Sequence, residues 1–304
     1  QSNSFAFGGS NVSVILGKGA RNSRATATSG AATLDTAATL DTATSGAASS
    51  AQLRFFVLGA DLWADGFANA RAWLDGVSDP SIDKPEATLL PARQRGRASP
   101  LTRLLAELHG RWQSDPTRFD AQNVSLFVGS AYGEMTTTLA LLDQIGVDAT
   151  LSPAKFQSSV HNTAAGLLTL NATNRGFSTA IAAGASTFAM TLVDALVYLQ
   201  TQGGEASVLV ADETGPRRML RGKTFPALGI GLHVVASDHA PAGALAELSL
   251  PFRSAPRATP DGAGALVESP AAWGLQLLRH VLATSVEESE LVIGPTSSIR
   301  VRPV

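Results

Sequence analysis

The sequence predicts an α/β fold in which helices cover both faces of a layered sheet. The composition is the first observation: 44% of the 304 residues are hydrophobic and 16% are charged, which is enough apolar material for a sizeable core. The second is that short apolar runs alternate with helical stretches from Val124 onward. Strands that are buried on both faces have such continuous apolar runs, and this alternation is typical of a sheet between two helical layers.

The first folded elements begin near Leu53. Residues 53–59 form an apolar run that is typical of a strand and ends at Gly59. In residues 61–74 the apolar side chains recur at nearly helical spacing, which predicts a helix. Ser99 followed by Pro100 is a typical helix start, and the leucines that follow predict one buried helical face, at positions 101, 104, 105 and 108.

The central part of the chain repeats the strand and helix pattern. We predict strands at residues 124–128, 177–183 and 206–212 and helices at 132–142 and 184–200. Between them, residues 152–166 read as a loop followed by a helix. After residue 240 the pattern weakens, but residues 273–281 predict an amphipathic helix and residues 291–301 a final pair of strands or a tail.

The chain divides into four predicted segments. Residues 19–51 consist mostly of Ala, Thr, Ser and Gly and predict a flexible linker, because they hold too little apolar bulk to offset chain entropy. Before the linker, residues 1–18 end in an alternating strand pattern. After it we expect a main domain at 52–250 and a C-terminal helix and tail at 251–304. The chain begins at Gln1, and we expect it to be a fragment of something longer.

The composition excludes several classes of function. A net charge of −2 argues against a general nucleic-acid-binding protein. The absence of cysteine excludes disulfides, thiolate metal sites and a cysteine nucleophile from these residues. The sequence has no uninterrupted apolar run of the roughly 18 residues that a membrane span needs, so we expect a cytoplasmic protein without a membrane span.

The start of the chain resembles the closing loop of a β-ketoacyl synthase. Residues 3–11 read Asn-Ser-Phe-Ala-Phe-Gly-Gly-Ser-Asn, close to the pattern of that loop, and a strand pattern follows. Glycine permits positive φ and close approach to a bound group. The resemblance implies that this segment is the last strand of a preceding ketosynthase, and that its gate loop over the acyl pocket includes Phe5, Phe7, Gly8, Gly9 and Asn11.

A second resemblance lies at the strand-to-helix turn where ketosynthases carry their catalytic cysteine. Aligned with that pattern, residues 179–188 place Gly184 at the position of the nucleophile, and a shift of one residue would place Ala183 there. Neither residue has a side chain that attacks a thioester. We therefore expect no catalytic residue here and no covalent acyl transfer by this domain.

The wider pattern resembles the short chain-length factors of aryl-polyene gene clusters, which hold the N-terminal half of the thiolase-like fold. The resemblance covers roughly residues 53–250 and includes the family motif His161 and Asn162. It implies a heterodimer with a catalytic ketosynthase, which is encoded upstream in a fused form, and substrates carried on the phosphopantetheine of an acyl carrier protein, with no cofactor or metal. The interface and the end of the acyl tunnel are expected at Phe177, Thr179, Ile181, Ala183, Gly184, Phe188 and Met190.

The same residues leave other functions open. One is a degenerate ketosynthase module in an array of condensing enzymes. Another is a serine hydrolase that combines Ser186 with His161 or His233 and with Asp212 or Asp238, although the chain has no G-x-S-x-G motif. We expect His161 to be a buried histidine at a helix start that bonds loop backbone, and His233 and His239 to lie in a surface loop without a metal.

The sequence also holds two basic clusters. The first holds Arg93, Arg95, Arg97 and Arg103, and the second holds Arg217, Arg218, Arg221 and Lys223. Such clusters are most often solvated loop charges, but a basic rim also attracts acidic carrier proteins.

Overall fold

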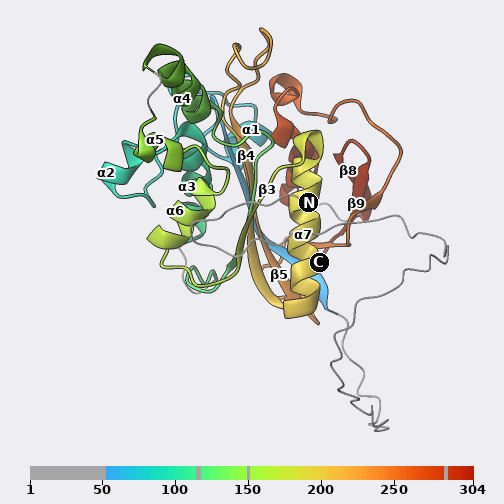
Figure 1. The fold of residues 1–304 in the computed structure, drawn as a ribbon. Coiled ribbons are helices and arrows are strands. Elements are labelled where there is room, and N and C mark those ends of the chain that lie inside the picture. The colour runs from blue at the N-terminus through green and yellow to red at the C-terminus, as the bar shows by residue number, and fades with distance from the viewer. Residues whose placement is uncertain (1–52, 114–117, 149–150, 284–286) are drawn as a thin grey trace, which may run out of the picture. The chain divides into compact units, whose positions relative to one another are not determined.

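A nine-stranded mixed sheet forms the centre of the molecule, in the order β3-β2-β4-β5-β1-β6-β9-β7, with β8 paired to β9 (Figure 1). This computed structural model describes residues 53–113, 118–148, 151–283 and 287–304. The predicted tail strand, gate loop and linker, at residues 1–51, lie outside the described residues. The strands are β1 (Arg54–Ala64), β2 (Ser125–Gly129), β3 (Ser178–Ile181), β4 (Gly204–Asp212), β5 (Leu228–Ser237), β6 (Ala246–Leu248), β7 (Phe252–Arg253), β8 (Ser289–Gly294) and β9 (Ser297–Arg302).

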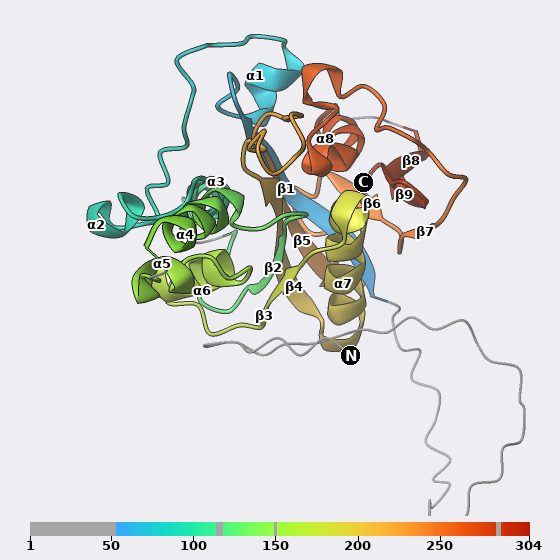
Figure 2. The ribbon, with the colours of Figure 1, turned by 45° about the horizontal axis from the view of Figure 1, so that its top comes forward.

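Helices cover both faces of the sheet, as the sequence predicts (Figures 1 and 2). One face carries α3 and α6, and the other carries α7 and α8. The α-helices are α1 (Ala70–Leu74), α2 (Ala92–Arg95), α3 (Pro100–Trp112), α4 (Met135–Asp148), α5 (Pro153–Gln157), α6 (Thr163–Asn171), α7 (Thr187–Gln202) and α8 (Leu275–Leu282). Short 3₁₀ helices are formed by Gly184–Ser186, Gly264–Leu266 and Pro270–Gly274.

The strand directions bring several loops to one edge of the sheet. β2 runs parallel to both β3 and β4, whereas β5 runs antiparallel to β4 and to β1. The carboxyl ends of β1, β2, β3 and β4 therefore point the same way. The loops that follow these strands meet at this edge, where α/β sheets usually place their functional residues.

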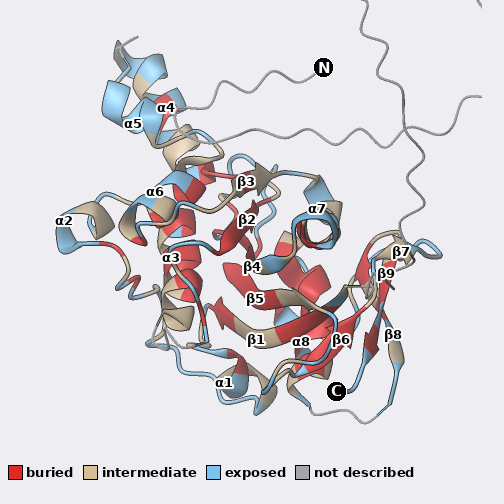
Figure 3. Cartoon of the chain, turned by 90° about the horizontal axis from the view of Figure 1, so that it is seen from below, coloured by how far each residue is buried: buried red, intermediate tan, exposed pale blue. Residues whose placement is uncertain are grey.

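Two apolar cores lie on opposite faces of the same strands. In β2, Phe127 faces the core under α7, while Leu126 and Val128 face the core under α3 and α6. β4 alternates in the same way, because Val208 belongs to the first core and Leu209 to the second. Figure 3 shows the resulting burial of the central strands. The continuous apolar runs of the sequence therefore reflect burial on two sides.

The close contact between α3 and β5 depends on Gly229. A Cβ atom at this position would lie 1.9 Å from Cδ2 of Leu104 and 2.8 Å from Cδ1 of Leu108. Both leucines are fully buried, so neither has room to move away. A glycine is needed here to let the helix rest directly on the strand.

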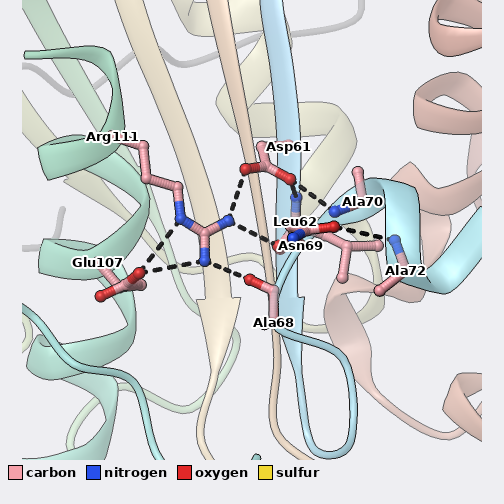
Figure 4. Close-up of polar contacts among 8 residues, drawn as sticks. All are labelled: Asp61, Leu62, Ala68, Asn69, Ala70, Ala72, Glu107 and Arg111. Carbon is pink, nitrogen blue, oxygen red and sulfur yellow. Dashed lines mark hydrogen bonds and ion pairs between the residues drawn. The ribbon is translucent and has the colours of Figure 1, made fainter. Parts of the chain in front are cut away.

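Arg111 fixes α3 to β1 and to the loop before α1 (Figure 4). Its Nη1 donates to Oδ2 of Asp61 at 2.6 Å and to the Leu62 carbonyl at 2.9 Å. Its Nη2 donates to the Ala68 carbonyl and to Glu107, and Nε also donates to Glu107 at 3.2 Å. The five N–H groups of the guanidinium thus have acceptors in three separate segments.

The strand predicted at residues 53–59 is found, but the helix predicted at residues 61–74 is wrong over most of its length. β1 continues through Ala64, and only Ala70–Leu74 are helical. The whole of β1 pairs with β5, with a register shift between Val57 and Gly59. Long-range pairing with β5 therefore overrides the helical spacing of the apolar residues. The expected helix at 132–142 is also displaced, because α4 begins at Met135 and continues to Asp148.

The helix start at Ser99 is confirmed, since the Ser99 hydroxyl accepts the amide of Thr102 at 2.9 Å. The predicted final strands are confirmed as β8 and β9. The amphipathic helix predicted at residues 273–281 is found as the 3₁₀ turn Pro270–Gly274 followed by α8. These C-terminal elements belong to the same sheet and the same core as the residues before position 250. In the described part of the chain, no helix combines the length and apolarity that a membrane crossing requires.

Candidate functional site

The candidate site is the turn between β3 and α7, at the carboxyl edge of the parallel strands. Gly184 has a φ of +56°, and the 3₁₀ turn Gly184–Ser186 leads directly into α7. The Thr187 hydroxyl closes the turn by accepting the Ala183 amide at 3.0 Å and donating to the Gly184 carbonyl at 2.7 Å. This is the tight strand-to-helix geometry that presents a nucleophile at the start of a helix, with glycine at its apex.

The space at the apex is open. Gly184 and Ala185 are exposed, and a Cβ atom at position 184 would meet no described atom within 4 Å. A side chain would have room at this point, although the left-handed backbone disfavours one. Position 184 is thus a glycine in a left-handed conformation with open space around it.

The neighbouring loop after β2 is held by Asp212 at the end of β4. Its carboxylate accepts the Ser130 hydroxyl at 2.8 Å and the amides of Tyr132 and Ala131 at 3.1 and 3.2 Å. Asp212 is 1% exposed, and burial raises its pKa to about 6 despite these three donors. Asp212 is thus a support that fixes the loop beside the nucleophile turn.

Two further buried carboxylates lie behind this loop. Oε1 of Glu134 accepts the Thr102 hydroxyl at 2.9 Å, and Oε1 of Glu213 accepts the Thr136 amide at 2.7 Å. Burial, together with the smaller effect of the nearby charge of Glu213, raises the pKa of Glu134 to about 7. Burial also raises the pKa of Glu213. These groups join the first turns of α3 and α4 to the end of β4.

The structure does not assemble the hydrolase alternative. Nε2 of His161 lies 3.0 Å from the Ser130 carbonyl, as expected for a histidine that bonds loop backbone, although the ring is half-buried. The second candidate, His233, is 3% exposed within β5 and lies 2.6 Å from Oε2 of Glu205, so its predicted place in a surface loop is wrong. Asp212 bonds Ser130 and two amides, and none of its hydrogen bonds reaches a histidine.

The predicted interface residues on β3 lie at one end of the sheet. In the described part of the chain, β3 pairs with β2 alone, so its other edge has no strand beside it. Thr179 is buried, whereas Ile181 is half-buried. Phe177, just before the strand, stacks on Tyr198 of α7 with ring centres 4.7 Å apart.

The predicted tunnel residues lie deeper. Phe188 is 1% exposed, and its ring packs so closely on Gly274 that a Cβ there would lie 2.3 Å from Cε2. Met190 is half-buried against the same core. Phe188 is thus enclosed by side chains and backbone of this chain. Ala183 lies in the turn, and Asn162 precedes α6 without a side-chain cap.

The basic clusters differ in their surroundings. Arg217, Arg218, Arg221 and Lys223 are all exposed in the loop after β4, where Arg218 forms an ion pair with Asp143. In the other cluster Arg103 is half-buried on α3. His239 is exposed beside Asp238, and the described residues hold no group of side chains suited to a metal ion.

Sequence reasoning missed the roles of Ser130, Glu134 and Glu213. Glu134 lies in the loop between the buried strand β2 and α4, and Glu213 directly follows Asp212 at the end of the buried strand β4. Their position in the sequence is the one signal that could have pointed to these roles. A buried carboxylate needs hydrogen-bond donors, and the first turn of a helix supplies them as free amides. The partners themselves come from α3 and α4, which only the fold brings together.

Comparisons with known proteins show which family the chain belongs to. The model of the β-ketoacyl synthase N-terminal domain matches residues 69–286. No curated protein matches the chain. Three solved complexes share the fold, each with this chain aligned over nearly all of one subunit.

The first is the ketosynthase ApeO in complex with its chain length factor ApeC from Xenorhabdus doucetiae, with 20% identity over 82% of this chain and 100% of that chain and a TM-score of 0.61. The ishigamide ketosynthase/chain length factor has 12% identity, covers 83% of this chain and 99% of that chain, and has a TM-score of 0.63. The complex AntDE:AntF, a type II polyketide synthase acyl-carrier protein with its ketosynthase, has 11% identity, covers 83% of this chain and 100% of that chain, and has a TM-score of 0.63. With a family match over most of its length, this chain belongs to the β-ketoacyl synthase family through the N-terminal, thiolase-like domain.

Proposed function

We propose that this chain is a non-catalytic partner of a catalytic β-ketoacyl synthase, acting as a chain-length factor in polyketide or fatty-acid-like biosynthesis, with aryl-polyene synthesis as the type of pathway. It shapes the acyl tunnel of the synthase by forming a heterodimer with it. The acyl chains are carried on the phosphopantetheine of an acyl carrier protein, and the chain uses no cofactor of its own. Two of the structurally similar complexes are described as pairs of ketosynthase and chain length factor, which supports the pairing.

One observation carries the proposal. Gly184 lies at the apex of the turn between β3 and α7, which we take to correspond to the nucleophile turn of ketosynthases, with a φ of +56° and open space around it, in a sequence without cysteine. A ketosynthase needs a thiolate at this point to accept the acyl group. Retaining the turn without the thiol leaves a domain that can pair and shape a cavity but cannot form the acyl-enzyme.

The position of β3 supports the pairing. Its free edge offers unpaired backbone groups from a short strand, and such edges are suited to strand addition by another chain. Phe177 and Ile181, both half-buried, border this edge. The tunnel end is proposed at Phe188 and Met190 on the first turns of α7, directly after the nucleophile turn.

The exposed cations after β4 support a role for the carrier protein. Arg217, Arg221 and Lys223 stand on the loop that begins at the carboxyl edge of the sheet, the edge that also holds Gly184. An acidic carrier protein would be attracted to them at low ionic strength. The gate loop at Phe5, Phe7, Gly8, Gly9 and Asn11 is proposed to belong to the preceding ketosynthase, fused to this chain.

The experiment compares the chain alone with the chain in complex. Purified protein is incubated with acyl-carrier and malonyl-carrier substrates, and mass spectrometry searches for an acyl-enzyme and for ketoacyl product. We expect neither from this chain, and we expect product when the catalytic ketosynthase from the same gene cluster is added. An acyl adduct on Ser186 of the chain alone would instead support the hydrolase.

A further inference from the structure

A small cavity lies beside the first turn of α3, at the carboxyl ends of β1 and β4. Its volume is about 250 Å³, which suits a small metabolite rather than a drug-sized ligand. The buried side chains of Trp63 and Leu104 form part of its wall. The charged residues of the wall are Asp65, Asp83, Glu213, Lys84 and Arg103. We call this space the α3 cavity.

Two buried polar atoms belong to residues on the wall of the α3 cavity and have no partner. Nε of Arg103 is buried without a hydrogen-bond acceptor. Glu213 is 2% exposed, and its Oε2 has no donor, although its Oε1 accepts the Thr136 amide at 2.7 Å. Buried polar groups in folded proteins almost always have hydrogen-bond partners. A donor and an acceptor that both lack one, beside the same cavity, therefore point to a ligand.

The charges on the wall do not neutralise one another. In the described part of the chain, Arg103 forms no ion pair with any acid, and neither does Lys84. Burial raises the pKa of Glu213, and partial burial together with the charge of Asp83 raises the pKa of Asp65. These carboxylates therefore lack a cation, while the guanidinium lacks an anion.

This combination indicates a ligand that carries both signs of charge. A carboxylate suits the parallel N–H groups of a guanidinium, and an ammonium group suits an unpaired carboxylate. A phosphate alone would face three acids, and an amine alone would face Arg103 and Lys84. The apolar part of the wall, with Trp63 and Leu104, leaves room for an aliphatic side chain.

We infer that the α3 cavity binds a free aliphatic α-amino acid, with the ligand carboxylate on Arg103 and its ammonium group on Glu213 and Asp65. The exposed residues Asp83 and Lys84 give access from solvent. The bound ligand would join the loop after β1, the start of α3 and the loop after β4, so it should stabilise the folded chain. The inference uses neither Gly184 nor a partner subunit, so it stands apart from the proposed function.

The first test compares three probes on the full wild-type chain by ligand-observed NMR titration. They are L-leucine, 4-methylpentanoate, which lacks the ammonium group, and 3-methylbutylamine, which lacks the carboxylate. We expect L-leucine to bind at least about tenfold more tightly than either analogue, because each analogue loses a hydrogen-bonded charge. L-leucine should also raise the melting temperature of the chain.

The second test locates the binding site with two variants and their matched controls. Arg103→Met and Glu213→Gln should each weaken L-leucine binding by about tenfold or more. Glutamine keeps an acceptor for the Thr136 amide, and circular dichroism verifies that both variants fold. The controls are Arg257→Met and Glu290→Gln, at exposed positions outside the cavity, and should change the affinity by less than about twofold.

Several results would overturn the inference. Saturable binding of L-leucine that is absent from the wild-type chain excludes the site, and equal binding of all three probes excludes recognition of both charges. Unchanged binding by both folded variants places the site elsewhere. If a variant does not fold, the three probes on the wild-type chain still decide. None of these results bears on pairing with a ketosynthase, which the acyl-transfer experiment measures separately.

Discussion

Replacing Glu134 by Gln should change how the stability of this domain depends on pH. Glu134 is 2% exposed; its Oε1 accepts the Thr102 hydroxyl, while Oε2 is buried without a hydrogen-bond partner. Burial raises the pKa of its carboxyl group from an ordinary value of 4.5 to about 7, and the charge of Glu213 acts in the same direction. The folded protein therefore binds a proton at Glu134 more tightly than the unfolded chain does.

The sign and size follow from linkage. Because the pKa is raised on folding, the stability that the proton contributes is present below about pH 4.5 and is lost as the pH rises through about 7. A shift of this size corresponds to about 3.5 kcal/mol at most, since one pKa unit is about 1.4 kcal/mol. In a domain of this size, 1 kcal/mol shifts the melting temperature by about 2–4 °C. Burial also raises the pKa values of Asp212 and Glu213, so these two groups likewise lower the stability of the folded protein as the pH rises.

The assay is thermal unfolding followed by circular dichroism between pH 5 and pH 8. Glutamine keeps an acceptor for Thr102 and carries no charge, so Glu134→Gln should melt near the wild-type temperature at pH 5. At pH 8 the same variant should melt on the order of 5–10 °C above wild type. Glu290→Gln, on an exposed position of β8, is the control and should leave the pH profile unchanged. A Glu134→Gln profile parallel to that of the wild type would refute the argument.

Three further predictions follow from the contacts described above. Phe188→Ala should cost about 3–5 kcal/mol of stability by denaturant unfolding, and, where the heterodimer survives, mass spectrometry of carrier-bound products should show longer chains; an unchanged distribution would make Phe188 ordinary core. Arg111→Met should cost about 3–5 kcal/mol in urea unfolding because it leaves Asp61 and Glu107 without their cation, and a loss below 1 kcal/mol would contradict the network in Figure 4. Replacing Arg217, Arg221 and Lys223 by Glu should weaken carrier-protein binding several-fold at low salt but little at 0.5 M salt, and equal effects at both would exclude steering by charge.

Much of the fold could be predicted because its strongest signals are local. Continuous apolar runs identified β2 and β4, which are buried on two faces, and the Ser99-Pro100 pair identified the start of α3. The failure at residues 61–74 has the opposite cause. There the helical spacing of the apolar side chains is real, but the pairing of β1 with β5 continues through Ala64 and outweighs it. His233 was misplaced for a similar reason, since β5 is a ten-residue strand that includes it.

In the candidate site, too, the features that depend on local sequence could be predicted and those that depend on long-range contacts could not. The turn at Gly184 could be located from sequence because a strand, a turn and a helix follow one another in the chain. The carboxylates behind it could not, since Glu134 takes its donor from Thr102, 32 residues away, and Asp212 takes its first donor from Ser130, 82 residues away. These supports hold the loops beside a turn whose apex is Gly184. The raised pKa values of Glu134 and Asp212 belong to carboxyl groups whose hydrogen bonds position loops, so a raised pKa by itself does not identify a catalytic residue. The residue at position 184 therefore bears most directly on the proposed function, and among the described residues the unpaired edge of β3 is where a strand of a partner can add.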